Sequence, residues 1–173
     1  MKATQTLAHQ LGINEYVLAR NLEGISHSEG LVFPEPGGNC INWVVGHLVD
    51  TRNKALQVVG RQPVFPIERF SMYTGHSDVT FDSDRAIPLT ELMEAYGELQ
   101  TPLAEGVLEM SDEQLASPAP FSPTENPDET VGTLLAGLAF HESYHTGQTG
   151  VLRRVIGKEG ALHAPEPQMA EPV

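Results

Sequence analysis

Several kinds of residue are scarce in this sequence, and each shortage excludes a class of protein. Cysteine occurs once, as Cys40, so no disulfide can form within the chain. No apolar run approaches the ~18 residues that a membrane-spanning helix needs. The first residues, MKATQTLAHQLG, lack the apolar core of a secretory signal peptide, and we therefore expect a cytoplasmic protein.

Basic side chains are also few. The 173 residues include 10 lysines and arginines against 23 aspartates and glutamates, which gives a net charge of -13. A surface of this charge repels phosphate groups, which argues against a nucleic-acid partner and against docking on an anionic membrane. We expect a small-molecule substrate instead.

Apolar residues recur at steps of three and four in four segments, and no segment alternates in the manner of a strand. This spacing predicts four amphipathic helices, over about 4–28, 40–60, 89–109 and 127–156. The last helix has the clearest start, because Asn126 can cap it and Pro127 suits its first position. Two long connections join the second predicted helix to the third and the third to the fourth. We therefore expect an all-α four-helix bundle with crossover loops.

A chain of this length is most simply one domain. We expect the helical domain to occupy residues 1–158. Residues 159–173 are rich in proline and show no periodicity, so they are expected to form a separate C-terminal tail.

The most informative stretch is HESYH, which places His141 and His145 four residues apart on one helical face. Two imidazoles on an otherwise apolar stripe need partners, and a divalent metal ion would satisfy both. In zinc proteases with an HExxH motif the glutamate, here Glu142, activates water. Such sites need a third ligand, but Gln148 stands three residues after His145, and no histidine follows at the required place.

An alternative third ligand lies upstream, in the second predicted helix. His47 sits beside the apolar face of NCINWVVGHLVDTRNKAL, and in a bundle it can point toward His141 and His145. Three imidazoles from two helices would leave a position open for water or substrate. The competing interpretation is a core histidine that is bonded to a backbone carbonyl.

Further candidates are open to two interpretations each. Glu142 is a general base, a partner that orients an imidazole, or a charge between helices. Cys40 is a fourth ligand or a buried free thiol. The candidates for contacts with a substrate are Asn42, Trp43, His76 and Gln148, for which a structural role is the alternative.

Two motifs together resemble the DinB-like (DinB/YfiT) superfamily: GGNCINWVVGHLVDTRNKAL and, a hundred residues later, HESYHTGQTGVLRRVIG. The resemblance covers roughly residues 1–158 and implies an up-down-down-up four-helix bundle that is often a homodimer. It also implies a divalent metal ion, typically zinc or nickel, held by His47, His141 and His145. All three positions are filled in this sequence.

The resemblance also implies a class of reaction. Members with known activity include transferases and isomerases that use low-molecular-weight thiols, so we expect a metal-dependent thiol S-transferase. Two alternatives stay open from the residues. One is a non-catalytic metal- or ligand-binding stress protein, and the other is an HExxH metallohydrolase with Glu142 as its base.

Overall fold

The computed structural model describes residues 2–75 and 81–162, and within these ranges the chain is helical, with no strand. The all-α prediction is therefore confirmed. Four long helices carry the fold: α1 (Ala3–Leu22), α3 (Ile41–Val58), α4 (Leu89–Glu109) and α6 (Val131–Val155). None of the described helices is both long enough and apolar enough to cross a membrane.

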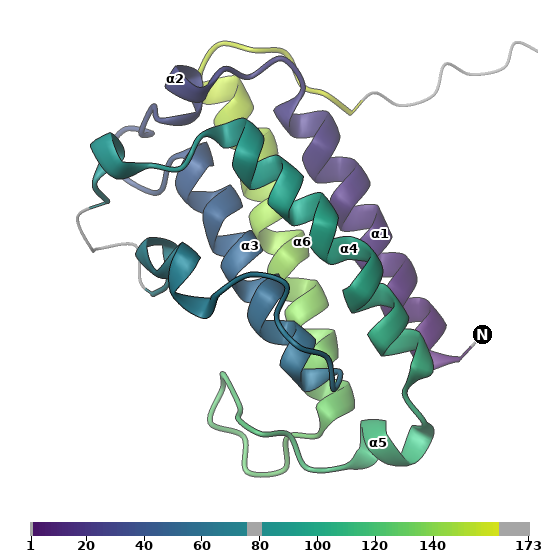
Figure 1. Ribbon diagram of the computed structural model, residues 1–173. Helices are drawn as coiled ribbons and strands as arrows, with labels where there is room; N and C mark the ends of the chain where they lie inside the picture. The colour runs from purple at the N-terminus through teal and green to yellow at the C-terminus, as the bar shows by residue number, and fades with distance from the viewer. Residues whose placement is uncertain (1, 76–80, 163–173) are drawn as a thin grey trace, which may run out of the picture.

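The four long helices pack side by side around one core. α1 contacts α4 and α6, and α3 contacts the same two helices, so α4 and α6 lie at opposite corners. Figure 1 shows that α1 and α6 run toward one end of the molecule while α3 and α4 run toward the other. This is the up-down-down-up order that the resemblance implies. α3 and α6 face each other across one of these contacts, so side chains from the two helices can form a shared site.

The first helix is shorter than its apolar pattern predicts. It ends at Leu22, and Gly24 follows with a φ of 71°, a conformation that favours glycine and that no helix continues. A separate turn, α2 (His27–Gly30), begins at Ser26, whose side chain accepts the N–H of Glu29. The prediction of one helix to residue 28 is wrong because it counted this turn as part of α1.

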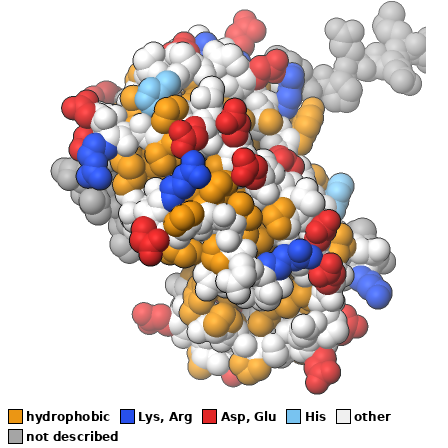
Figure 2. Space-filling model, viewed as in Figure 1, with side chains coloured by type: hydrophobic (Ala, Val, Ile, Leu, Met, Phe, Trp, Pro, Cys, Tyr) orange, Lys and Arg blue, Asp and Glu red, His pale blue; other side chains and the backbone are white. Residues whose placement is uncertain are grey.

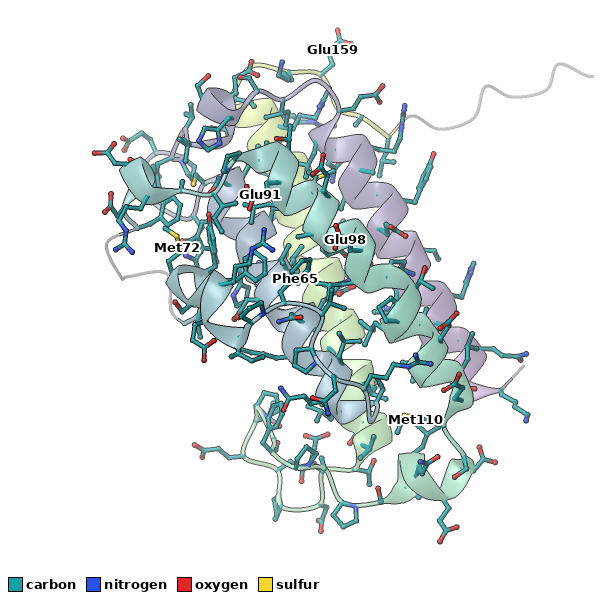
Figure 3. The ribbon with its side chains drawn as sticks, in the orientation of Figure 1. Phe65, Met72, Glu91, Glu98, Met110 and Glu159 are labelled. Atoms are coloured by element: carbon teal, nitrogen blue, oxygen red, sulfur yellow. The ribbon has the colours of Figure 1, made fainter. Side chains whose placement is uncertain are left out.

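The long connection between α3 and α4 contains two short 3-10 segments, η1 (Ile67–Tyr73) and η2 (Ser83–Arg85). η1 packs against α3 and buries Phe70 and Tyr73 in the core. Figure 3 shows Phe65 and Met72 in this region, beside α3. The connection is therefore part of the packed domain.

The start of α6 differs from the prediction at Asn126. The helix begins at Val131 and is capped by Thr130. The residues before it pair with the segment after α5 (Asp112–Ala116): the N–H of Ala119 donates to Glu129, and the N–H of Val131 donates to Ser117. These residues therefore pair with the segment after α5, although the local capping signals assign them to the helix.

Candidate metal centre

Three histidines converge between α3 and α6. His47 comes from the middle of α3, and His141 and His145 come from successive turns of α6. The ring centroid of His47 lies 5.0 Å from that of His141 and 5.0 Å from that of His145, and the two α6 rings are 4.6 Å apart. A potential ligand atom from each residue lies within 4.8 Å of the others.

The spacing of the nitrogens fits a shared divalent ion. Nε2 of His47 and Nε2 of His141 are 3.1 Å apart. Two nitrogens bound to one tetrahedral zinc ion at ~2.0–2.1 Å lie about 3.3 Å apart. The two imidazoles therefore need little movement to share an ion, and the third ring lies at the same distance from His47.

Neighbouring groups fix the protons of two of the three rings. Nδ1 of His47 lies 2.9 Å from the backbone oxygen of Tyr73, and because a carbonyl only accepts, this nitrogen carries the proton. Nδ1 of His145 donates in the same way to the side-chain oxygen of Gln148, at 3.0 Å. Both rings consequently present Nε2 with a free lone pair, as a metal ligand requires.

His141 lacks such support. Its Nδ1 is buried and has no hydrogen-bond partner in the described part of the chain. Burial, with His145 and His47 as its neighbours, lowers the pKa of His141 to about 4. Burial also lowers the pKa of His145. Both imidazoles are therefore neutral at pH 7, the state in which an imidazole can bind a metal ion.

Further hydrogen bonds hold Tyr73, whose carbonyl accepts the proton of His47, in the connection between α3 and α4. The hydroxyl of Tyr73 donates to the side-chain oxygen of Asn42 and accepts the N–H of Ile87. The side-chain amide of Asn42 donates to the carbonyl of Ile87. Asn42 is fully buried, and its hydrogen bonds to Tyr73 and Ile87 hold the connection against α3.

A pocket of about 500 Å³ opens over the three histidines. Trp43 stacks on His47, with ring centroids 4.9 Å apart, and Tyr144 lies edge-on to His145. Gln148 lines the pocket with Trp43, and so does Tyr144, which sequence reasoning missed. The helical spacing offered a signal, because Tyr144 stands three residues after His141 and such residues are neighbours on a helix surface. The described lining contains no carboxylate and no ammonium group.

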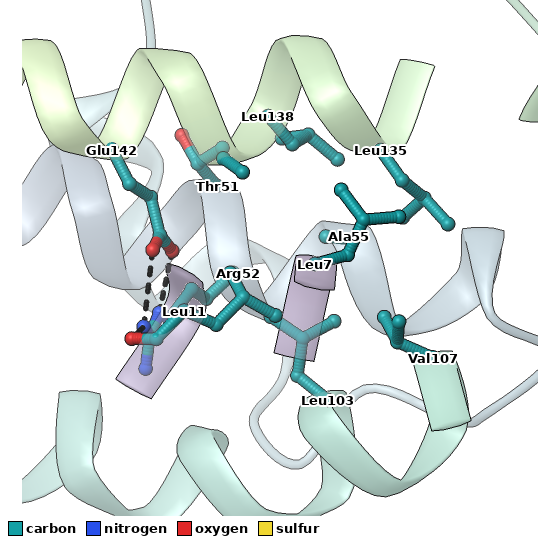
Figure 4. Close-up of a pocket in the computed structure, with 11 residues that line it drawn as sticks. Leu7, Leu11, Thr51, Arg52, Ala55, Leu103, Val107, Leu135, Leu138 and Glu142 are labelled. Carbon is teal, nitrogen blue, oxygen red and sulfur yellow. Dashed lines mark hydrogen bonds and ion pairs between the residues drawn. The ribbon is translucent and has the colours of Figure 1, made fainter. Parts of the chain in front are cut away.

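Glu142 turns away from this pocket although it lies next to His141. Its carboxylate forms two hydrogen bonds with buried Arg52, at 2.5 Å from Nε and 3.0 Å from Nη2 (Figure 4). The side chains expose 2% and 0% of their surface, respectively. The cavity beside them measures about 10 Å³, which is no larger than a water molecule needs. Glu142 therefore lines this small interior cavity and not the pocket over the histidines.

The pair lies in a network that joins the four long helices. Arg52 also donates to the backbone oxygen of Leu11 on α1 and to the side-chain oxygen of Gln100 on α4. The amide of Asn14 donates to Glu142 from α1. Sequence reasoning missed Arg52, because its partner lies 90 positions away and no local spacing relates the two.

Two other candidates lie apart from the centre. His76 falls outside the described residues. Cys40 is completely buried at the start of α3 and does not belong to the cluster of potential metal ligands found among the described residues.

Comparison with known proteins identifies the family and supports the fold. The sequence model of the DinB superfamily matches residues 10–149, a span that includes all three histidines. A conserved protein from Enterococcus faecalis, known from its crystal structure, has a similar fold, with a TM-score of 0.71 and 16% sequence identity. The match covers 90% of this chain and 98% of that one. No curated protein matches the sequence.

Proposed function

Because the chain belongs to the DinB superfamily, we propose that His47, His141 and His145 hold a divalent metal ion on which its function depends. The observation that carries the proposal is the convergence of three imidazoles, two of which have their Nδ1 protons engaged by other groups. The centre suits zinc or nickel, which both accept imidazole ligands.

We further propose that the protein is a metal-dependent transferase that uses a low-molecular-weight thiol. A bound divalent ion lowers the pKa of a coordinated thiol or water, so that a nucleophile is available at neutral pH. Three imidazole ligands add no negative charge to the centre, and the described pocket lining adds none either, which favours an anionic ligand. Trp43 and Tyr144 supply apolar walls that orient the rest of a small substrate.

The arrangement of Glu142 favours this transferase over an HExxH metallohydrolase. A general base has to come within hydrogen-bond reach of the water that it activates. The carboxylate of Glu142 is instead engaged by Arg52 and Asn14 in the interior.

The protein is also proposed to act as a homodimer.

The metal content of the purified protein tests the centre. Protein dialysed against zinc or nickel is expected to retain about one ion per chain, and His47→Ala is expected to lose most of it, because removal of one of three ligands weakens coordination. His9→Ala, which removes an exposed histidine of α1, is the matched control and is expected to bind like the wild type. Full retention of metal by His47→Ala would show that the upstream ligand is wrong.

Thiols test the reaction class once the metal is bound. A low-molecular-weight thiol is expected to raise the melting temperature of the metal-loaded wild type and to leave His47→Ala unchanged, because ligands that bind only the folded state stabilise it. If metal-loaded protein responds to no thiol in such a screen, the transferase proposal fails while the metal centre stands.

A further inference from the structure

The side chain of Gln148 ends in an oxygen and a nitrogen, and His145 engages the oxygen. Gln148 stands three residues after His145 on α6, so the two side chains are neighbours on the helix surface. The oxygen accepts the proton on Nδ1 of His145, at 3.0 Å. The amide nitrogen is bonded to the same carbon and lies about 2.2 Å from the oxygen. Whatever holds the oxygen of this planar group therefore also fixes the direction of its nitrogen.

The amide nitrogen of Gln148 is accessible, and it carries two N–H groups. Within residues 2–75 and 81–162, no group accepts a hydrogen bond from it. In the same part of the chain, the buried side-chain atoms without a partner are Nδ1 of His141 and Oγ1 of Thr146, so the nitrogen of Gln148 is not closed off from solvent. Gln148 also lines the pocket over the histidines. Its N–H groups are therefore available to a ligand in that pocket.

The proton of His145 decides which end of the carboxamide is available. A glutamine side chain can exchange the positions of its oxygen and nitrogen by rotation, and it then offers an acceptor instead of a donor. An imidazole that offers Nε2 to a metal ion keeps its proton on Nδ1. Of the two ends of Gln148, only the oxygen can receive this proton. A metal-binding His145 thus leaves the nitrogen of Gln148 as the outer group.

The other two histidines have no comparable neighbour in the described chain. Nδ1 of His47 lies against the backbone oxygen of Tyr73, and a carbonyl oxygen cannot donate to a ligand. Nδ1 of His141 has no hydrogen-bond partner. His145 is therefore the histidine whose support also offers a donor to the pocket.

The described pocket lining carries no charge with which to select a ligand. Figure 2 shows acidic side chains spread over the molecular surface, in agreement with the net charge of -13. The described lining of the pocket, in contrast, contains neither a carboxylate nor an ammonium group. Hydrogen bonds from a few polar groups then decide how a small ligand lies between the walls of Trp43 and Tyr144.

We propose that Gln148 positions His145 with its oxygen and binds a ligand with its amide nitrogen. The ligand class is a small molecule that presents an oxygen acceptor, as a carboxylate or a carbonyl group does, over the histidines. The inference rests on the metal centre proposed above and names the chemistry that its pocket selects. The positioning role can be tested without metal, so the two proposals can fail separately.

NMR of the ring nitrogens tests the positioning role on metal-free, full-length protein at about pH 8, where imidazoles are neutral. In the wild type, the proton of His145 is expected on Nδ1. Gln148→Leu has no acceptor, so a large part of this proton is expected to move to Nε2. Gln148→Glu restores an acceptor and should keep the proton on Nδ1. An unchanged position of the proton in Gln148→Leu would overturn the positioning role.

Cobalt(II), whose visible spectrum reports its ligands, extends this test to the metal centre. Gln148→Leu is expected to bind cobalt ~10–100-fold more weakly than the wild type, because a ligating histidine loses the partner that orients it. Gln148→Glu should bind cobalt at least as tightly as the wild type. Gln57→Leu, the same change at an exposed position of α3, is the matched control and should behave as the wild type in every measurement.

Acetate and imidazole, titrated into cobalt-saturated protein, test the ligand role. Acetate brings an oxygen acceptor, whereas imidazole offers one nitrogen to the metal and carries a proton on the other. Gln148→Leu is expected to bind acetate at least ~10-fold more weakly than the wild type and to bind imidazole with unchanged affinity. Gln148→Glu should also lose acetate, since its carboxylate offers no donor and repels the anion. Circular dichroism establishes that each variant is folded.

Three results would contradict the ligand role. Equal acetate affinity in the wild type and Gln148→Leu would overturn it, and so would an equal loss of acetate and imidazole, which indicates general damage to the pocket. A wild type that binds no cobalt would overturn the metal centre and the ligand role together. The NMR comparison would still decide the positioning role in that case.

Discussion

At the scale of single residues, the contact between Gly46 and Tyr73 decides how His47 is held. A Cβ atom at Gly46 would overlap the ring of Tyr73, so only glycine allows this ring to lie directly on α3. The close approach brings the backbone oxygen of Tyr73 to Nδ1 of His47. A residue without any side chain thus determines which nitrogen of the neighbouring histidine is free.

Gly46→Ala should therefore affect both folding and the metal centre. We expect a loss of ~1–3 kcal/mol in the free energy of unfolding, because an added methyl forces buried Tyr73 to shift. Loss of the bond to His47 should weaken metal binding by ~10–100-fold. Chemical denaturation and metal titration measure the two effects.

Gly137→Ala on α6 is the control for that substitution. Its added Cβ would meet no atom within 4 Å, and alanine favours helix, so the variant should be as stable as the wild type or up to ~1 kcal/mol more stable. Unchanged metal affinity in Gly46→Ala would contradict the role given to the Tyr73 carbonyl.

At the scale of elements, side chains of α3 hold the connection between α3 and α4 in place. The side-chain amide of Asn53 donates to the carbonyl of Phe65 and accepts its N–H, so it pairs with the backbone as another strand would. Further along, the hydroxyl of Thr74 donates to Asp50. These contacts bracket η1 and so position the carbonyl of Tyr73.

Asn53→Ala is expected to loosen this connection. The substitution leaves the N–H and C=O of Phe65 without their partner, which should cost about 1–3 kcal/mol of stability. Amide hydrogen exchange in η1 should become faster, while exchange in α6 should change only as far as global stability does. Gln57→Ala, at an exposed position of α3, should leave both unchanged. Equal exchange in η1 for the two variants would mean that Asn53 does not hold the segment.

Helix interiors could be predicted from the sequence more accurately than some helix ends. The apolar steps of the third predicted helix give α4 its bounds at Leu89 and Glu109, because burial on one face repeats along the whole element. The end of α1 and the start of α6 depended on Gly24 and on the pairing of Ser117 with Val131. The pairing of Ser117 with Val131 is a tertiary contact, and such a contact has no signature in the local sequence.

The candidate site divides in the same way. The four-residue step from His141 to His145 predicts that both rings lie on one face of a helix. The apolar pattern of the second predicted helix indicates that His47 can point toward them. The carbonyl of Tyr73 could not be predicted, since any residue supplies a carbonyl and only the folded connection brings this one to His47. Arg52 could not be assigned for a related reason, because its partner is set by how α3 and α6 pack.

At the scale of the whole molecule, the buried pair of Arg52 and Glu142 connects the long helices through charge. Glu142→Gln removes the negative partner and leaves a guanidinium in the interior. We expect a loss of ~3–5 kcal/mol in the free energy of unfolding, measured by urea denaturation of metal-free protein. If Glu142 were instead a base beside substrate, the same variant would lose activity with little change in stability.

The double variant Arg52→Met, Glu142→Leu separates charge from packing. It removes both charges and keeps apolar volume, so it should recover much of the stability that Glu142→Gln loses. A double variant as unstable as the single one would mean that the surrounding hydrogen bonds, for example from Asn14 and Gln100, dominate.

Adjacent residues of a helix project ~100° apart, and α6 uses this angle to face two environments at once. His141 points to the other imidazoles, and Glu142 points to Arg52. Any turn of α6 about its axis that withdrew His141 from His47 would also pull Glu142 from its buried partner. These two contacts therefore fix the rotation of α6 about its own axis. Movement at the site is left to side chains at the rim of the pocket, such as exposed Tyr144, rather than to the helix that carries the histidines.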